Sequence, residues 1–169
     1  MSGAGAIVIR EGRAADAPVL AAIHRRARQA AMPGLREAHS EAEVADWIAA
    51  TLMRVHRVAV AEQDGTPIGY IGFGEDARHG PMVLHLYLAP GWRGKGIGAR
   101  LLQVAADALG PQLSLYCITR NAGALRFYQR QGFRIAARGD GAGTEEGEPD
   151  LLLHRDTRST EFNDREDNP

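Results

Sequence analysis

The sequence predicts an α/β domain with a mixed sheet. Two observations lead to this prediction: strand-like runs alternate with helical periodicities, and 169 residues suit one hydrophobic core rather than two. The expected element order is β-α-α-β-β-β-α-β-α-β-β. The chain shows neither an internal repeat nor a linker. Residues 1–158 are therefore expected to form a single domain, and residues 159–169 a polar, flexible tail.

The first expected elements are a strand and a helix. The apolar run AIVIR (6–10) predicts a short strand. Asp16 followed by Pro18 is typical of a helix start, with Asp16 as the N-cap and Pro18 in the first turn. Apolar residues then recur at helical spacing as far as Ala30, and MPGL (32–35) is expected to end this helix.

A second helix and a β-hairpin are expected next. The sequence SEAE (40–43) is a capping-box pattern. The helix that it opens is expected to have one apolar face, which carries Val44, Trp47, Ile48, Thr51, Leu52 and Val55. Asp64-Gly65 is a turn signal between two strand-like runs, 57–62 and 67–73, and therefore predicts a hairpin.

The C-terminal half alternates strands with helices. Strands are expected at 81–88, 112–118, 133–138 and 150–154, and helices at 98–109 and 121–131. Gly110 and Gly132 are the expected helix ends, and Asn121 is the expected N-cap of the last helix. Residues 139–149 form a glycine-rich acidic loop.

The composition excludes several classes of protein. A net charge of −1 and a pI near 6.6 give no general attraction to nucleic acid. Neither a signal peptide nor a run of 18 apolar residues is found, so no membrane partner is expected. Cys117 is the only cysteine and is read as a small buried hydrophobe. A lone cysteine fits a reducing compartment, so a cytoplasmic protein without a metal site is expected.

The stretch between the strand at 81–88 and the helix at 98–109 has an unusual composition. Arg93-Gly94-Lys95-Gly96-Ile97-Gly98 places three glycines and two cations in six residues at the start of a helix. A helix N-terminus has unpaired N–H groups and partial positive charge, and glycines let a ligand reach them. The stretch therefore predicts a phosphate site. The structural alternative is a strand-to-helix turn that only requires positive φ angles.

Three phosphate-binding patterns compete for this stretch. A Walker A loop fails because Lys95 is followed by Gly96 instead of Ser or Thr. The dinucleotide pattern G-x-G-x-x-A is matched by GKGIGA (94–99). However, a hairpin precedes it, and no acidic residue stands about 20 positions further on. The third pattern, R/Q-x-x-G-x-G/A after a strand, is matched from Arg93 to Gly98.

With this third pattern the sequence resembles the GNAT family, the Gcn5-related N-acetyltransferases. NAGALRFYQRQGF (121–133) resembles a second family pattern, N-x-x-A-x-x-F/Y-Y-x-x-x-G-F, at the expected spacing and after the expected strand. The resemblance runs in element order from about residue 7 to residue 154. It implies a mostly antiparallel central sheet flanked by about four helices. It also implies an acetyltransferase that uses acetyl-CoA as its co-substrate.

The resemblance assigns a cofactor site. The pyrophosphate of acetyl-CoA is expected on the glycine-rich turn, and the pantetheine arm along the backbone of the strand before it. The implied cofactor-binding residues are Leu86, Tyr87, Leu88, Arg93, Gly94, Lys95, Gly96, Ile97, Gly98 and Asn121. Asn121 has an alternative role as a helix N-cap, which contributes about 1 kcal/mol.

The resemblance also makes Tyr128 the expected catalytic residue. The matching family tyrosine acts as general acid to the departing CoA thiolate. The alternative is a core aromatic, because the helix that carries Tyr128 has to pack on the sheet.

The group that takes the proton of the attacking amine is less well defined. The glutamate that many family members carry on the central strand is missing here. His85 is the candidate base relay, on the same strand face as Tyr87 and opposite Leu84. Glu75 and His79, expected in the following loop, are alternatives, as is transfer without a protein base.

The acceptor pocket is implied to lie between the first two helices, within 16–56, and the loop at 139–149. Glu145 and Glu146 of this loop are the candidate substrate-binding residues, since they would attract a cationic amine. A solvated acidic loop is the alternative. The expected reaction is direct acetyl transfer, in a ternary complex, to an unidentified small-molecule or peptide amine. A non-catalytic acyl-CoA sensor on the same fold is the alternative function, and a homodimer is the expected assembly.

Overall fold

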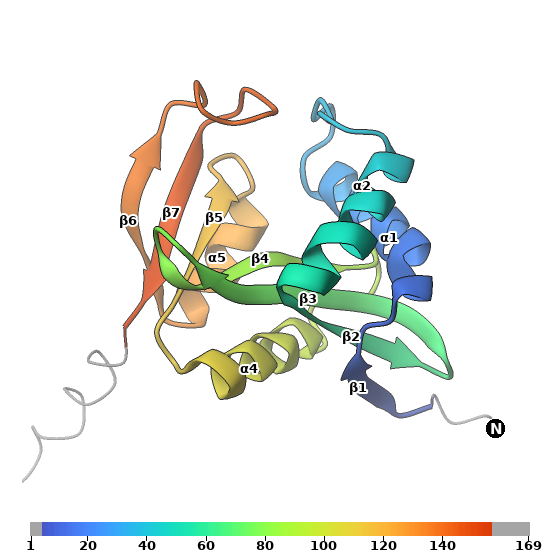
Figure 1. Cartoon of the computed structure of the whole chain (residues 1–169). Coiled ribbons are helices and arrows are strands. Elements are labelled where there is room, and N and C mark those ends of the chain that lie inside the picture. Colours follow the sequence, from blue (N-terminus) through green and yellow to red (C-terminus); the bar gives the residue numbers. More distant parts are fainter. Residues whose placement is uncertain (1–4, 157–169) are drawn as a thin grey trace, which may run out of the picture.

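Seven strands form one sheet in the computed structural model, which describes residues 5–156 (Figure 1). The strands are β1 (Ile7–Glu11), β2 (Arg57–Gln63), β3 (Thr66–Asp76), β4 (Gly80–Leu88), β5 (Leu113–Ile118), β6 (Phe133–Gly139) and β7 (Asp150–Arg155). Their order across the sheet is β1-β2-β3-β4-β5-β7-β6, and only β4 and β5 run parallel. The predicted mixed, mostly antiparallel sheet is confirmed. The predicted tail at 159–169 lies outside the described residues.

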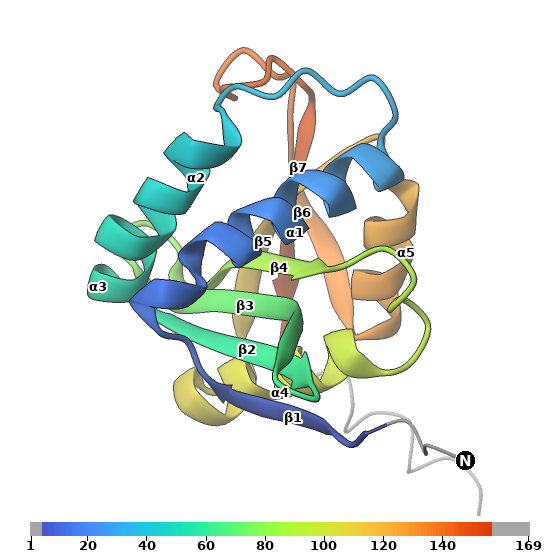
Figure 2. The same ribbon diagram turned by 90° about the vertical axis from the view of Figure 1, so that its right-hand side faces the viewer.

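Helices cover both faces of this sheet (Figures 1 and 2). They are the 3-10 turn η1 (Ala14–Asp16), α1 (Ala17–Ala31), α2 (Glu41–Trp47), the π-helical turn η2 (Ile48–Leu52), α3 (Met53–Val55), α4 (Ile97–Leu109) and α5 (Ala122–Arg130). Because α2, η2 and α3 follow one another without a break, the described chain has four helical segments, as predicted. In this part of the chain no helix is both long and apolar enough to cross a membrane.

The core has two parts, one on each face of the sheet. On one face, α4 and α5 bury Leu101, Leu102 and Tyr128 against the strands. On the other face, α1 and the segment that follows α2 bury Leu20 and Ile48. Full burial of a Leu or Ile side chain contributes about 1.5–3 kcal/mol. The two layers therefore hold the central strands, on which the site is built, from both sides.

The second helix begins as predicted but changes its face along its length. The Ser40 hydroxyl accepts a hydrogen bond from the Glu43 N–H at 3.1 Å, and the Glu43 carboxylate accepts one from the Ser40 N–H at 2.7 Å. Ile48 and Leu52 are buried, but Val55, predicted on the same face, is 69% exposed. The π-helical turn explains this error, because its wider turn rotates the following residues away from the 3.6-residue periodicity.

Asp16 does not cap α1 with its side chain, which corrects the prediction. Its carboxylate instead accepts hydrogen bonds from the Arg10 guanidinium at 2.8 and 2.9 Å, and from the Arg13 N–H at 2.7 Å. The bond to Arg13 closes the 3-10 turn η1, which precedes α1 and was not predicted. Arg10, the largest contributor, lowers the pKa of Asp16 below its ordinary value.

A β-bulge in β4 changes which side chains share a face. His85 pairs with Gly72 and Val83 pairs with Phe73, so Leu84 is the extra residue. Leu84 therefore packs on the side of the sheet that carries Tyr87, and the prediction that it opposes this residue is wrong. An extra residue shifts the alternation of side chains by one position, which sequence periodicity does not reveal.

The sheet opens between β4 and β5. These strands pair only at Met82 and Ser114, whereas β5 pairs with β7 from Leu113 to Ile118. Beyond Met82, β4 therefore continues toward Leu88 without a paired neighbour on its β5 side. The backbone groups on that side face the opening, and the candidate site lies there.

Candidate active site

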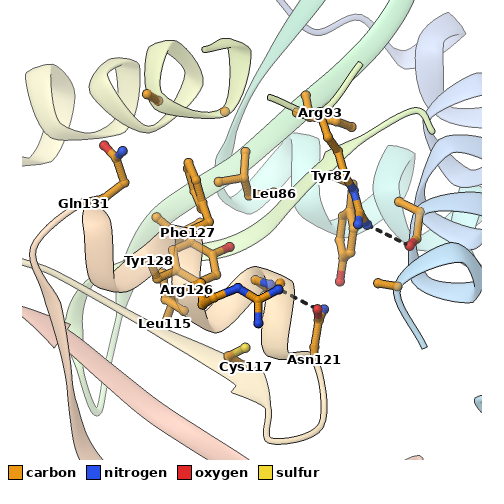
Figure 3. Close-up of a pocket in the computed structure, with 18 of the residues that line it drawn as sticks. Leu86, Tyr87, Arg93, Leu115, Cys117, Asn121, Arg126, Phe127, Tyr128 and Gln131 are labelled. Carbon is orange, nitrogen blue, oxygen red and sulfur yellow. Dashed lines mark hydrogen bonds between the residues drawn. The ribbon is translucent and has the colours of Figure 1, made fainter. Parts of the chain in front are cut away.

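A first cavity of about 680 Å³ lies in the opening between β4 and β5 (Figure 3). Its walls come from the end of α1, the C-terminal half of β4, the glycine-rich turn, β5 and α5. The predicted cofactor residues gather here from three separate segments of the chain: Leu86, Tyr87, Leu88, Arg93, Gly94, Gly96, Ile97, Gly98 and Asn121. Lys95 is the predicted cofactor residue that does not line the cavity.

The glycine-rich turn presents an uncapped helix start to this cavity. Gly96 is the N-cap of α4 and has φ of 78°, and Gly94 has φ of 75°. A Cβ at either position would have no neighbour within 4 Å, so left-handed backbone, not crowding, requires these glycines. No side chain caps α4, although Ser40 caps α2 and Asn121 caps α5. The N–H groups of the first turn are thus available to an anion.

Gly98 has a different role from the other two glycines. It lies inside α4, where a Cβ would be 3.1 Å from Cζ of Phe127. The absence of a side chain lets α4 and α5 approach closely, with the Phe127 ring against the backbone. The structure therefore combines both readings of the turn: a backbone suited to an anion, and a glycine required by packing.

The two cations of the turn point in different directions. Arg93 lines the cavity, and its Nη2 donates a hydrogen bond to the Ala27 carbonyl at 3.3 Å (Figure 3). The Lys95 Nζ lies 4.7 Å from the ring centroid of Trp92, in a cation–π arrangement. Trp92 thus holds the lysine outside the cavity wall, and only the arginine reaches the cavity.

Two further arginines line the first cavity, and sequence reasoning did not single them out. Arg126 and Arg130 lie one turn apart on α5 and face the same space as Arg93. The sequence feature that could have identified both arginines is their spacing of four residues within the second family pattern. Arg28 of α1 also lines this cavity, so the wall combines an open helix start with four guanidinium groups, which suits a ligand with several negative charges.

Asn121 has the capping role considered for it, and its contact with the cofactor stays a prediction. Its side-chain oxygen accepts a hydrogen bond from the Ala124 N–H at 3.1 Å, which caps α5 (Figure 3). Asn121 also lines the first cavity, next to the end of β5. The amide group not used in the cap remains available to a ligand.

Tyr128 projects from α5 into the wall of the first cavity (Figure 3). It is 8% exposed and makes edge contacts with the rings of Phe127 and Phe133. Burial raises the pKa of Tyr128 well above its ordinary value, so the hydroxyl keeps its proton at neutral pH. The residue is a core aromatic whose protonated hydroxyl belongs to a side chain that lines the cavity.

Cys117 lines the same cavity, although sequence reasoning placed it only in the core. It is buried, as predicted, and burial raises the pKa of its thiol to about 11. The thiol therefore stays protonated at neutral pH and is a poor nucleophile.

A second cavity of about 590 Å³ lies on the other face of β4. Its walls come from α1, the segment before α2, α2 itself, β4 and the loop before β7. Arg28, Leu84 and Tyr87 line both cavities. The two cavities therefore meet at the C-terminal half of β4, beside the Tyr87 side chain.

Arg28 lies at this junction, and sequence reasoning did not identify it. It is 8% exposed, and its Nη2 donates to the Glu146 carboxylate at 2.7 Å while its Nε donates to Glu37 at 3.1 Å. The sequence feature that could have identified Arg28 is its position directly after Ala27, on the apolar face of the predicted first helix. The bond to Glu146 fixes the loop at 139–149 beside α1 (Figure 2).

Glu145 and Glu146 reach the second cavity, but as partners of other side chains. Glu146 is paired with Arg28, and Glu145 lies 2.8 Å from Nε2 of His39. The charged groups on this wall are Arg28 together with the carboxylates of Glu37, Glu43, Glu145 and Glu146. Four carboxylates against one arginine give this cavity a negative charge.

His85 faces the second cavity from β4. Its Nδ1 lies 2.9 Å from the hydroxyl of Tyr70, and its ring stacks on His24 of α1 at a centroid distance of 5.1 Å. Burial lowers the pKa of His85 to about 3 and that of His24 to about 2, so both rings are neutral at pH 7. His24 was not identified from the sequence.

The other two base candidates lie away from this cavity. Glu75 belongs to β3, which extends to Asp76, and its side chain is exposed. His79 lies in the turn that follows, where its Nε2 is 2.8 Å from the hydroxyl of Tyr116. Both were expected in one loop, but the hairpin continues further than predicted. Across residues 5–156 no cluster of three potential metal ligands is found.

Comparison with known proteins agrees with this arrangement. The model of the acetyltransferase (GNAT) domain matches residues 54–135, which include β4, the turn and α5. A peptidyl-lysine N-acetyltransferase of Salmonella typhimurium, YjaB, is 31% identical over 135 residues, or 79% of this chain and 88% of the relative. The chain belongs to the GNAT family of acetyltransferases.

A shorter match to a curated relative and two solved structures of the same fold are also found. A probable N-acetyltransferase of Mycobacterium tuberculosis is 35% identical over 82 residues, which is 47% of this chain and only 47% of that relative. The apo form of YjaB from Escherichia coli has a TM-score of 0.71 at 24% identity, covering 88% of this chain and 97% of that one. YncA of Salmonella typhimurium, solved with acetyl-CoA, has a TM-score of 0.68 at 22% identity, covering 89% and 93%. These structures establish the fold.

Proposed function

We propose that this protein is an N-acetyltransferase that moves the acetyl group of acetyl-CoA to a primary amine by direct transfer in a ternary complex. The observation that carries the proposal is the pair of cavities that meet beside Tyr87. The first has an open helix start and four arginines in its wall, and the second is negatively charged. A cofactor and an amine in these two cavities could react without a covalent enzyme intermediate.

Acetyl-CoA is proposed to occupy the first cavity. Its pyrophosphate would accept hydrogen bonds from the N–H groups between Gly94 and Gly98, with Arg93 beside it. The pantetheine arm would pair with the backbone of β4 on the side that β5 leaves open. A neighbour of the same fold, YncA, was solved with acetyl-CoA, which supports the choice of cofactor.

Tyr128 is proposed to assist the departure of CoA. The amine nitrogen forms a bond to the acetyl carbonyl carbon, and the bond from that carbon to sulfur breaks. Negative charge collects on the sulfur, and the Tyr128 hydroxyl donates its proton to it, so that CoA leaves as the thiol. The nitrogen gives up one proton to water, and the Tyr128 phenolate regains a proton from water. The raised pKa of this buried phenol keeps the proton in place until that charge develops.

The acceptor is proposed to be a cationic primary amine that enters the second cavity. The excess of carboxylates on that wall attracts an ammonium group and does not favour an anion. The peptidyl-lysine specificity stated for the Salmonella relative is consistent with such an acceptor. The proposed acceptor is a small molecule or a peptide side chain that carries such an amine. Assembly as a homodimer stays a prediction.

The first test is acetyl-CoA binding by isothermal titration calorimetry. Arg93→Ala should weaken binding about 10-fold or more, because a charge-assisted hydrogen bond contributes about 1.5–3 kcal/mol. Lys95→Ala should weaken it less, since Nζ rests on Trp92. Arg78→Ala, in the β3–β4 turn outside both cavities, is the matched control. Absence of binding in the wild-type protein would refute the proposed cofactor.

The second test separates catalysis from binding. Release of CoA is followed with a thiol reagent while a panel of primary amines is added. Tyr128→Phe should lower kcat about 100-fold, the ordinary scale of general acid catalysis, with acetyl-CoA affinity within twofold of wild type. An unchanged kcat would remove Tyr128 from the mechanism. Binding of acetyl-CoA without release for any amine would favour the sensor function instead.

A further inference from the structure

Two neutral histidines form part of the wall of the second cavity, and they differ in what they can offer a ligand. His24 comes from α1 and His85 from β4, and their rings stack with 19° between their planes. A neutral imidazole has one nitrogen that donates and one that accepts. The neighbours of each ring decide which nitrogen faces the cavity.

The hydroxyl of Tyr70 fixes the tautomer of His85. Tyr70 is 0% exposed, and burial raises the pKa of its phenol, which therefore keeps its proton. A buried hydroxyl proton requires an acceptor. Among residues 5–156, the hydrogen-bond partner of this hydroxyl is Nδ1 of His85, at 2.9 Å. Nδ1 must then be the accepting nitrogen, so the hydrogen-bond network assigns the ring proton to Nε2. His85 can only donate from Nε2.

His24 has both ring nitrogens free. The residue is 8% exposed, yet neither nitrogen has a hydrogen-bond partner within the described part of the chain. Over the same residues, no fully enclosed side-chain nitrogen or oxygen lacks a partner. The nitrogens of His24 are therefore not fully enclosed, and the cavity that this residue lines is the second one. Because the ring is neutral, one of its two nitrogens carries a lone pair that can accept a hydrogen bond.

The neighbours of His24 hold its ring in one orientation. The His85 ring covers one of its faces, and the Tyr87 ring meets it edge to face at 4.7 Å. Tyr87 is also the residue beside which the two cavities meet. A group bound to His24 therefore lies next to the junction at which the acetyl group is expected.

We propose that His24 is the residue that holds the acceptor amine, through a hydrogen bond from the amine N–H to the unprotonated ring nitrogen. The inference rests on the proposed function and adds the residue that orients the nucleophile. Once the ammonium has given up a proton to water, an amine bound through its N–H can direct its lone pair elsewhere, toward an acyl carbon at the junction. His85, which presents an N–H to the cavity, cannot accept the same hydrogen bond. Its expected role is to donate to an oxygen atom of the acceptor.

The first experiment reads the tautomers directly. Protein labelled with ¹⁵N at histidine is examined at pH 7 by long-range ¹H–¹⁵N correlation, with CoA bound. The expected result is a proton on Nε2 of His85 and a neutral ring at His24. Added n-butylamine should shift the unprotonated nitrogen of His24. A proton on Nδ1 of His85, or an amine-dependent shift at His85 without one at His24, would overturn the inference.

The second experiment uses variants and the amine that the CoA-release assay turns over fastest. His24→Phe keeps a ring but removes the acceptor, and it should raise the KM for the amine about 10-fold. His24→Gln offers a carbonyl acceptor and should recover part of this loss. Both variants should bind acetyl-CoA within twofold of wild type. His56→Phe is the control, because His56 lines neither cavity.

Different results would contradict the proposed function and the role of His24. If wild-type protein binds no acetyl-CoA, the proposed function fails and the role of His24 fails with it. If acetyl-CoA binds and amines are acetylated, but His24→Phe has the amine KM of wild type, only the role of His24 fails. Equal effects of the Phe and Gln variants would also count against hydrogen bonding and favour a packing role.

Discussion

Arg28 provides the sharpest test of how the loop at 139–149 is held. Its side chain is 9% exposed and contacts two carboxylates, Glu37 at 11% and Glu146 at 21% exposure. Arg28→Leu keeps much of the apolar packing of the arginine stem but leaves both carboxylates without their cation. Breaking a buried ion pair by removing one partner destabilises a protein by about 3–5 kcal/mol.

The expected loss lies at the lower end of this range. Glu146 belongs to a loop whose other cross-links are on the surface, so it can regain water when Arg28 is gone, whereas Glu37 stays enclosed. We expect a decrease of about 3 kcal/mol in the free energy of unfolding. For a domain of this size that corresponds to a fall of about 6–12 °C in Tm.

Urea unfolding at pH 7, followed by circular dichroism, measures this loss. Arg120→Leu is the matched control, because the Arg120–Glu148 pair is 40% and 25% exposed and should contribute at most about 1 kcal/mol. A loss no larger than that of Arg120→Leu would refute the idea that Arg28 neutralises buried charge.

Three further predictions concern the capping box, the buried histidines and the contact between α4 and α5. Ser40→Ala should lower the free energy of unfolding by about 1 kcal/mol in urea titrations, and no change would contradict the capping role. The pKa values of His24 and His85 are lowered by burial to about 2 and 3. Stability should therefore fall as pH drops below about 6.5, by up to about 1.4 kcal/mol per unit for each ring, and His24→Phe should show a shallower slope. Gly98→Ala should destabilise by about 1–2 kcal/mol, and Phe127→Leu in the same chain should restore part of this; additive losses would exclude the contact.

The order of the elements could be predicted from the sequence because its signals are local. The capping box at Ser40, the turn at Asp64-Gly65 and the helix-ending Gly110 each depend on the conformation of a few neighbouring residues. The two family patterns are also local, and they placed the glycine-rich turn and Tyr128 correctly in the chain. The residues expected to bind the cofactor, apart from Lys95, therefore line one cavity, and their contacts with acetyl-CoA stay a prediction.

The errors occurred where neighbours in space, not in sequence, decide the conformation. Asp16 bonds to Arg10 of β1 instead of capping α1, because the fold brings this guanidinium within hydrogen-bond distance of its carboxylate. Leu84 changes faces because β3 and β4 pair around a bulge. Val55 is exposed because it follows a π-helical turn, which the spacing of apolar residues in the sequence does not predict.

The acceptor side depended almost entirely on tertiary structure. Arg28, Glu146 and His24 are distant in sequence or lack a motif, and they share one cavity only because α1 and the loop before β7 lie beside β4. Likewise, the buried Tyr70 hydroxyl, and not the sequence around His85, determines which ring nitrogen accepts. Local spacing determines a turn that suits phosphate, whereas charge balance, burial and tautomer depend on groups that meet only in the folded chain.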